Sequence, residues 1–226
     1  MIATVAGQLI TSLRRQRISG TIMGNGIRHG WDVGVLAAPA RWRRAARLPC
    51  GPRHGRRYQP LQVRLEAAQG SVRVAGRAAT ALAYNGGLPG PPLHLQPGDR
   101  LRVQLANRLD APTNLHVHCL HVSPEGNGDN AFVTLGPGET FDYDYQLPDD
   151  HPPGVYWYHP HLHGMVAEQV FGGLCGAIIV ADTQELPVTR ERVLVISDIT
   201  FDGDGRIPPA SSTARMMGRE GDPCPR

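Results

Sequence analysis

Two histidine pairs with the spacing His-x-His are the residues best suited to chemistry in this 226-residue chain. They are His116 with His118, and His159 with His161. Residues i and i+2 of a β-strand point to the same face, about 6.6 Å apart at Cα, so each pair would present two imidazoles side by side. Imidazole suits copper, zinc, iron and nickel rather than magnesium or calcium. Two such strands could direct four imidazoles into one pocket, and the sequence therefore predicts a metal site.

The other histidines are weaker candidates for ligands. His121 lies an odd number of residues from His118, so on a straight strand it faces away from the first pair. His163 shares the parity of His159 but lies about 13 Å further along an extended chain, which favours a supporting position over a ligand. The remaining histidines are isolated or lie in a loop, and we expect no metal at them: His29, His54, His94 and His151.

Short β-strands are the elements that must position these residues. From about Leu61 apolar and polar residues alternate, as in Leu61, Val63 and Leu65, and a period of two indicates half-buried strands. Turn clusters such as Gly126-Asn127-Gly128-Asp129 separate the runs at intervals of roughly 8 to 15 residues, which is typical of an antiparallel sandwich or barrel. We predict one all-β domain with strands near residues 61–65, 72–75, 79–84, 101–105, 114–119, 141–145, 155–161, 176–180 and 193–199.

Composition and charge exclude several classes of protein. Gly and Pro contribute 27 and 20 residues, just below the level of a low-complexity chain, so a folded domain is expected. No apolar run approaches the ~18 residues of a membrane span. Every basic residue is Arg, and eleven of the 23 lie in residues 1–60 beside a single acid. Because these Arg follow no periodic pattern, we predict no nucleic-acid-binding face. The four cysteines form no Cys-x-x-Cys pair, which argues against a disulfide scaffold or a zinc ribbon.

These patterns divide the chain into three parts. Residues 1–60 are predicted to be an irregular, Arg-rich arm that could be disordered, residues 61–201 the β domain, and residues 202–226 a linker or truncated tail. The arm has a basic start and an apolar stretch, but in the wrong spacing for a secretory signal, so no intact signal is expected. The run Asp202-Gly203-Asp204-Gly205 is predicted to form a hairpin turn rather than a calcium loop.

The residues around the two pairs resemble a known family. His116-Val117-His118-Cys119-Leu120-His121 precedes Gly126-Asn127-Gly128-Asp129, and Gly154-Val155-Tyr156-Trp157-Tyr158-His159-Pro160-His161-Leu162-His163-Gly164 precedes Gly172-Gly173-Leu174-Cys175-Gly176. Together these motifs resemble the first plastocyanin-like (cupredoxin) domain of the multicopper oxidases, a laccase-like family, over roughly residues 61 to 206. The resemblance implies a Greek-key, cupredoxin-like β-sandwich or barrel and a periplasmic or secreted location.

The same resemblance implies a cofactor and roles for residues. In that family the matching positions bind copper, so His116 would ligate a type 2 ion, and His118, His159 and His161 the type 3 ions. Together they would form half of a trinuclear cluster that reduces dioxygen to water with electrons from a small reducing substrate. Asp129 is the candidate catalytic acid that supplies protons, although an Asp in this context could equally be a turn residue.

Two departures from the family limit what the chain can do. The position after His118 is usually Gly, and here it is Cys119, which we expect to be a small buried residue on the opposite face rather than a thiolate ligand; Cys175 should also be a small packing residue. The chain has no His-Cys-His segment for a type 1 copper. We therefore expect it to be inactive alone, either because a closing domain or partner chain supplies the rest or because the chain is a truncated or frame-shifted product.

Two other functions use the same residues. The first is a non-catalytic protein that binds and buffers copper through the four histidines. The second is a cupin-like mononuclear metalloenzyme, in which His116, His118 and Glu125 would form a site of two histidines and one carboxylate.

Overall fold

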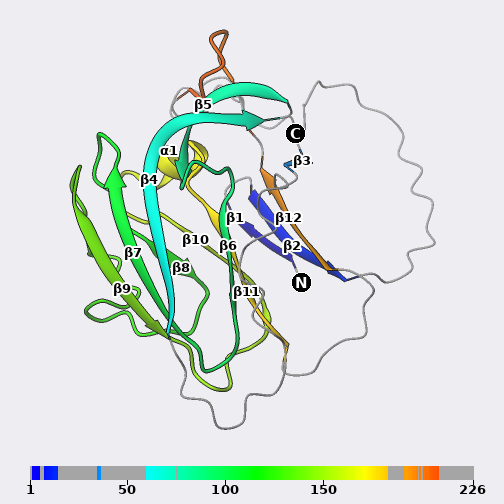
Figure 1. The fold of residues 1–226 in the computed structure, drawn as a ribbon, viewed down its shortest axis with the longest axis vertical. Helices are drawn as coiled ribbons and strands as arrows, with labels where there is room; N and C mark the ends of the chain where they lie inside the picture. Colours follow the sequence, from blue (N-terminus) through cyan, green and yellow to red (C-terminus); the bar gives the residue numbers. More distant parts are fainter. Residues whose placement is uncertain are drawn as a thin grey trace, which may run out of the picture.

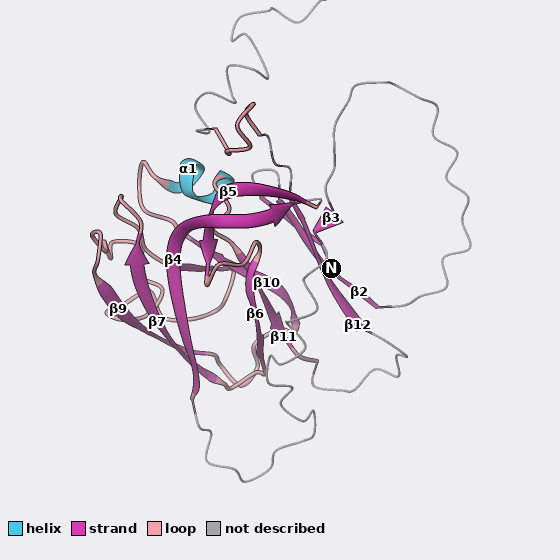
Figure 2. Ribbon diagram, turned by 45° about the horizontal axis from the view of Figure 1, so that its top comes forward, coloured by secondary structure: helices cyan, strands magenta, loops and turns pink. Residues whose placement is uncertain are grey.

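The described residues form three four-stranded sheets, two of which form a sandwich. The structure is a computed structural model that describes residues 60–74, 76–182, 191–197, 199 and 201–208, and the backbone of the strands at 2–5, 8–14 and 35–36. The sheet orders are β5-β4-β7-β9, β6-β11-β10-β8 and β1-β2-β12-β3. Figures 1 and 2 show the arrangement of these elements. The predicted all-β architecture is confirmed.

The first sheet is organised around one long, bent strand. It contains β4 (Leu61–Val74), β5 (Arg77–Tyr84), β7 (Arg100–Arg108) and β9 (Thr140–Gln146). Residues 61–68 of β4 pair in parallel with β7, and residues 67–74 pair antiparallel with β5; the bend between them is visible in Figure 1. The sequence predicted two separate strands here. They are one strand because the pairing with β5 begins where the pairing with β7 ends.

The second sheet carries the histidine pairs. It contains β6 (Gly90–Leu95), β8 (His116–His118), β10 (Gly154–His159) and β11 (Gly176–Val180). The sequence did not predict β6, whose Pro91 and Pro92 are unusual in a strand; it lies at the sheet edge, where Pro is tolerated. It also did not predict the helix α1 (Val166–Phe171), which is too short to show a helical period. Within the described residues no helix is long and apolar enough to cross a membrane.

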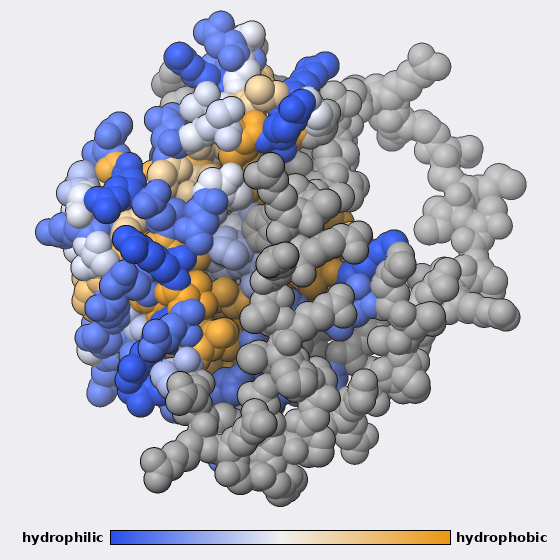
Figure 3. Space-filling view, in the orientation of Figure 1, coloured by the Kyte–Doolittle hydropathy of each residue, from blue (hydrophilic) through white to orange (hydrophobic). Residues whose placement is uncertain are grey.

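The main core lies between the first two sheets. Leu101, Val103 and Leu105 of β7 are at most 1% exposed, whereas the residues between them are exposed, as the alternating pattern predicts. In Figure 3 the left side of the molecule, where β7 and β9 lie, is mostly hydrophilic, with hydrophobic areas visible between the polar residues. From the opposite sheet, Val117 and Tyr158 enter the same core. A side chain at Gly176 would overlap the ring of Tyr158, so glycine is required beside it.

The third sheet contradicts part of the prediction for residues 1–60. It consists of β1 (Ile2–Val5), β2 (Gln8–Arg14), β3 (Val35–Leu36) and β12 (Glu191–Ser197). β2 and β3 both pair with β12, so the supposedly irregular arm contributes three strands. Pairing with a strand far away in the sequence is invisible to local periodicity, which explains the miss. The rest of the arm lies outside the described residues.

The predicted turn at residues 202–205 is present. Oδ1 of Asp202 accepts the backbone N–H groups of Asp204 at 3.0 Å and Arg206 at 2.8 Å, which is the usual side-chain geometry of an Asp-initiated turn. The N–H of Thr80 on β5 donates to the Gly205 carbonyl at 3.2 Å, and Ile207 packs near β5. The first residues of the predicted tail therefore pair with the free edge of β5, and residues 209–226 lie outside the described part.

Candidate metal centre

Strands β8 and β10 bring three of the four candidate histidines together. They pair antiparallel, with His116 opposite His159 and His118 opposite Trp157. Val117 and Tyr158, the residues between them, point into the core between the sheets. Because side chains alternate along a strand, His116, His118 and His159 all lie on the other face of the sheet. The His-x-His spacing of the first pair thus acts as the sequence predicted.

The three imidazoles are close enough to share a metal ion. One ligand atom from each of His116, His118 and His159 lies within 4.8 Å of the other two. Nε2 of His159 and Nδ1 of His118 are 3.4 Å apart. This is close to the separation of two nitrogen atoms that bind the same ion, each at a distance of about 2.0 Å. His159 is 4% exposed, and the other two rings are half-buried. The group is thus partly open to solvent.

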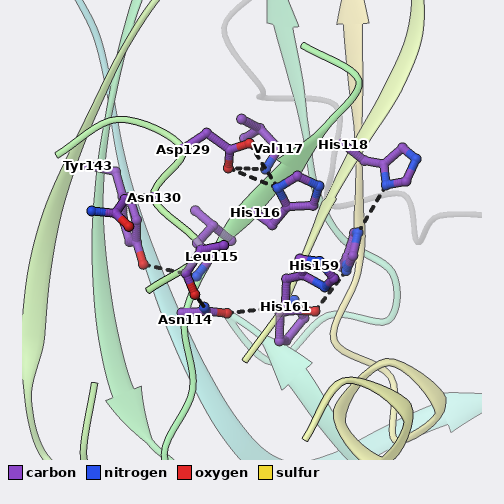
Figure 4. A network of polar contacts seen from close by, with 12 residues as sticks. Asn114, Leu115, His116, Val117, His118, Asp129, Asn130, Tyr143, His159 and His161 are labelled. Carbon is purple, nitrogen blue, oxygen red and sulfur yellow. Dashed lines mark hydrogen bonds and ion pairs between the residues drawn. The ribbon is translucent and has the colours of Figure 1, made fainter. Parts of the chain in front are cut away.

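His161 joins this group from outside the strand. The sequence predicted that it would continue the strand after His159, but β10 ends at His159 and Pro160 follows. Pro has no N–H for the ladder, which explains the early end. The His161 ring is nevertheless 5.0 Å from the His116 ring and 5.9 Å from the His159 ring, between centroids. Figure 4 shows all four imidazoles gathered in one place, although His161 itself is exposed.

Asp129 holds the imidazole of His116. Its Oδ1 accepts the N–H of Val117 at 3.0 Å, and its two carboxylate oxygens lie 3.0 and 2.9 Å from Nδ1 of His116. A carboxylate on Nδ1 fixes the tautomer with the proton on that nitrogen and leaves Nε2 as the ligand atom. The loop that follows β8 therefore returns to orient a residue of β8 itself (Figure 4).

Trp157 forms a wall of the group. Its ring stacks on His159 with centroids 3.9 Å apart and planes at 22°, and it lies 5.2 Å from the His118 ring. Trp157 is 4% exposed and belongs to a buried apolar cluster that also contains Val195 of β12. Because the buried indole contacts the rings of both His118 and His159, it restricts the rotation of these two imidazoles.

Comparison with known proteins places this arrangement in a family. A family model described as multicopper oxidase matches residues 66–185, which is more than half of the chain. The chain belongs to the multicopper oxidase family. It is 31% identical over 172 residues to copper resistance protein A of Pseudomonas syringae pv. tomato, covering 74% of this chain and 27% of that protein. It is 32% identical over 138 residues to a multicopper oxidase of Mycobacterium tuberculosis, covering 61% and 26%. The chain thus spans about a quarter of the length of these relatives.

Solved multicopper oxidases share the fold. The enzyme from Pseudomonas thermotolerans superposes with a TM-score of 0.53 at 28% identity, covering 68% of this chain and 37% of that one. The Campylobacter jejuni enzyme, described as a metallo-oxidase, gives 0.50 at 29% identity, covering 57% and 30%. The cupredoxin-like fold class is therefore confirmed, and the cupin-like interpretation is wrong. Glu125 is exposed and is not one of the grouped metal-binding side chains among the described residues.

The residues present fit copper, the metal that membership of a multicopper oxidase family implies. Burial lowers the pKa of His159 to about 3, with the neighbouring histidines adding to the effect against the opposing hydrogen bond to the Pro160 carbonyl. Burial, followed by the charges of His116 and His161, also lowers the pKa of His118. Neutral imidazole is the form that binds a metal, so these two side chains are in the form that could bind one at neutral pH.

The remaining histidines stay outside the group. The side chains of His121 and His163 are exposed. His151 is 1% exposed and structural: its Nε2 accepts the N–H of His121 at 3.1 Å, and its Nδ1 lies 2.9 Å from the Pro152 carbonyl. His94 is likewise not one of the grouped residues among those described, and His29 and His54 lie outside the described residues.

One prediction about the cysteines is wrong. Cys119 is exposed, not buried, because β8 ends at His118 and the backbone turns at Cys119 with a φ of 63°. This left-handed region favours glycine, which accounts for the glycine usual in the family at this position. Cys175 is fully buried, as predicted.

Two buried polar residues beside the site were missed. Asn114 and Gln169 are 1% and 2% exposed, and each bonds to a segment 47 or more residues away. Such contacts have no local sequence signal. Trp157, in contrast, could have been placed, because it shares the parity of His159 on a predicted strand.

Proposed function

We propose that this chain is the N-terminal cupredoxin domain of a multicopper oxidase and contributes half of a type 2/type 3 copper cluster. His116 would hold the type 2 ion, and His118, His159 and His161 the type 3 ions. Copper bound there would supply the one-electron redox chemistry with which the complete enzyme reduces dioxygen to water, using a small reducing substrate. The observation that carries this proposal is the convergence of the ligand atoms of His116, His118 and His159 within 4.8 Å.

The chain's own residues prepare the ligands. Asp129 fixes the tautomer of His116, the Pro160 carbonyl occupies Nδ1 of His159 at 2.8 Å, and Trp157 covers the inner side of the group. The half-buried and exposed rings face outward, where the closing cupredoxin domain or a partner chain would supply the remaining ligands. The proposal includes the periplasmic or secreted location that the family resemblance implies, which fractionation of expressing cells would test.

Copper titration tests the proposal directly. The full 226-residue chain is loaded with copper, dialysed, and assayed for metal per chain and for its absorption and electron paramagnetic resonance spectra. We expect tight copper binding without an intense blue thiolate band, because the sequence has no His-Cys-His segment. The double variant His118→Ala/His161→Ala should lose the metal, and His121→Ala, an exposed neighbour outside the group, is the matched control. Absence of copper, or equal binding by the double variant, would contradict the proposal.

A further measurement separates an oxidase domain from a copper buffer. The chain is mixed with, or fused to, a closing multicopper oxidase domain that carries a type 1 site, and oxygen consumption is followed with a phenol or cuprous ion. Turnover that depends on His118 and His161 supports the oxidase domain. Copper binding without turnover in a correctly folded fusion supports the non-catalytic function.

The role of Asp129 as a proton source is part of the same proposal. Both of its oxygens already lie against N–H donors, so the contacts support orientation of His116 at least as strongly as proton supply. Asp129→Asn in the fusion separates the two roles. Loss of copper affinity alone indicates orientation, whereas loss of turnover at full copper occupancy, with a changed pH profile, indicates proton supply.

A further inference from the structure

Asn114 connects the two histidine pairs from a buried position. It precedes His116 by two residues and is 1% exposed. Its Oδ1 accepts the backbone N–H of His161 at 2.7 Å, and its Nδ2 donates to the Ala131 carbonyl at 3.3 Å. Figure 4 shows the amide between the start of β8 and the segment that carries His161. One side chain therefore bonds to the second pair and to the loop that also contains Asp129.

His161 is the ligand that most needs such support. The other three histidines lie on paired strands, whereas His161 follows Pro160 and is exposed. A ligand on unpaired chain must lose more conformational freedom when it binds, unless another contact already restricts it. The bond from its N–H to Asn114 supplies that restriction.

A second buried contact holds the far end of the same segment. Gln169 lies on α1 and is 2% exposed. Its Nε2 donates to the Pro112 carbonyl, and its Oε1 accepts the hydroxyl of Thr113, both at 2.8 Å. The segment from Pro160 to Gln169 is therefore tied at both ends to residues 112–114, which we call the 112–114 clamp.

We propose that Asn114 is a positioning residue for the copper site and that the 112–114 clamp fixes His161 relative to His116. Asn114 touches no metal and acts through the backbone of His161. The proposal rests on the proposed function, since it assumes that His161 is a copper ligand. It adds a residue that the His-x-His motif does not contain.

The test uses the full chain and two measurements. Without copper, the amide hydrogen of His161 should exchange at least tenfold faster in Asn114→Ala than in the wild type, by NMR. With copper alone as the probe, competition titration should show about tenfold weaker binding, the usual cost of losing a supporting contact. Asn130→Ala is the matched control: Asn130 also bonds to loop backbone, at Gly126 and Phe132, but to no histidine, and both measurements should match the wild type.

A double-mutant cycle distinguishes positioning from general damage. In the His161→Ala background, Asn114→Ala should change copper affinity no further, because the two act through one group. An equal loss with and without His161, or no loss at all while the wild type binds copper, overturns the proposal. If the wild type binds no copper, the proposed function fails, while the exchange rate still reports whether Asn114 restrains His161.

A milder variant keeps the test available if Asn114→Ala does not fold. Thr113→Val removes only the hydroxyl that bonds to Gln169 and retains the side-chain shape. We expect a two- to fivefold loss of copper affinity that disappears in the His161→Ala background. A copper affinity equal to that of the wild type would overturn the proposal that the 112–114 clamp fixes His161.

Discussion

Among its described residues the protein contains two groups of neighbouring histidines, and their ring spacings are almost the same. The His121 and His151 rings are 5.0 Å apart, and the His116 and His159 rings are 5.1 Å apart. In the first group both nitrogens of His151 are occupied by backbone partners. In the second group Asp129 and the Pro160 carbonyl occupy Nδ1 of His116 and of His159, which leaves Nε2 of each ring for a metal.

This difference shows that ring proximity does not make a metal site. What matters is which nitrogen the protein itself uses. A histidine with both nitrogens bonded to the backbone stabilises a loop, whereas a histidine held by one nitrogen presents the other in a fixed direction. The two groups are only a few residues apart in sequence, so substitutions in each provide matched controls for the other.

The largest expected effect is loss of the metal from the second group. His159→Ala should weaken copper binding by on the order of 100-fold or more, because it removes a buried imidazole that we propose as a ligand and that stacks on Trp157. His121→Ala should leave the affinity unchanged. Competition with a chromophoric chelator measures both. Equal effects of the two substitutions would abolish the distinction between the groups.

A substitution in the first group, His121 and His151, should destabilise the fold without changing the copper affinity. His151→Ala removes a buried ring that accepts the His121 N–H and contacts Tyr156, with centroids 5.1 Å apart. We expect the free energy of unfolding to fall by about 2 kcal/mol, with copper affinity within a factor of two of the wild type. Urea unfolding followed by circular dichroism measures the first quantity. A large loss of copper affinity in a folded variant would show that the groups are coupled.

The common face of the histidines was easier to predict from the sequence than the elements around them. His116, His118 and His159 were correctly placed because the strand period alone determines their common face. His161 was placed on a strand that ends two residues earlier, since the effect of Pro160 was not included. β6 was missed because of its two prolines, and α1 because it is too short to show a helical period. The pairing of β2 with β12 was missed because it joins distant parts of the chain. Asn114 and Gln169 were also not predicted, because their hydrogen bonds join distant parts of the chain.

Acid should lower the free energy of unfolding of the copper-free protein, because His159 of the second group becomes protonated on unfolding. His159 has a pKa of about 3 in the folded state, below the ordinary 6.5 that it regains on unfolding. Between these values the unfolded chain binds the additional proton, so stability falls as the pH decreases below 6.5 and this contribution is fully present above it. One proton corresponds to about 1.4 kcal/mol per pH unit. His159→Gln should reduce the slope of unfolding free energy against pH between 6 and 5 by about that amount. An unchanged slope would show that His159 is protonated in the fold.

The smallest expected effect concerns Cys119, which lies in the sequence between His118 of the second group and His121 of the first. Its φ of 63° costs a non-glycine residue roughly 1–2 kcal/mol, and its exposed side chain contributes little packing. Cys119→Gly would relieve this strain, although the more flexible glycine also stabilises the unfolded chain by about 0.4–1 kcal/mol. We therefore expect a net gain of about 0.5–1 kcal/mol in the free energy of unfolding, with Cys119→Ala close to the wild type. Since copper affinity should be the same in all three proteins, a loss of affinity in both variants would identify the thiol as a ligand and contradict the geometry.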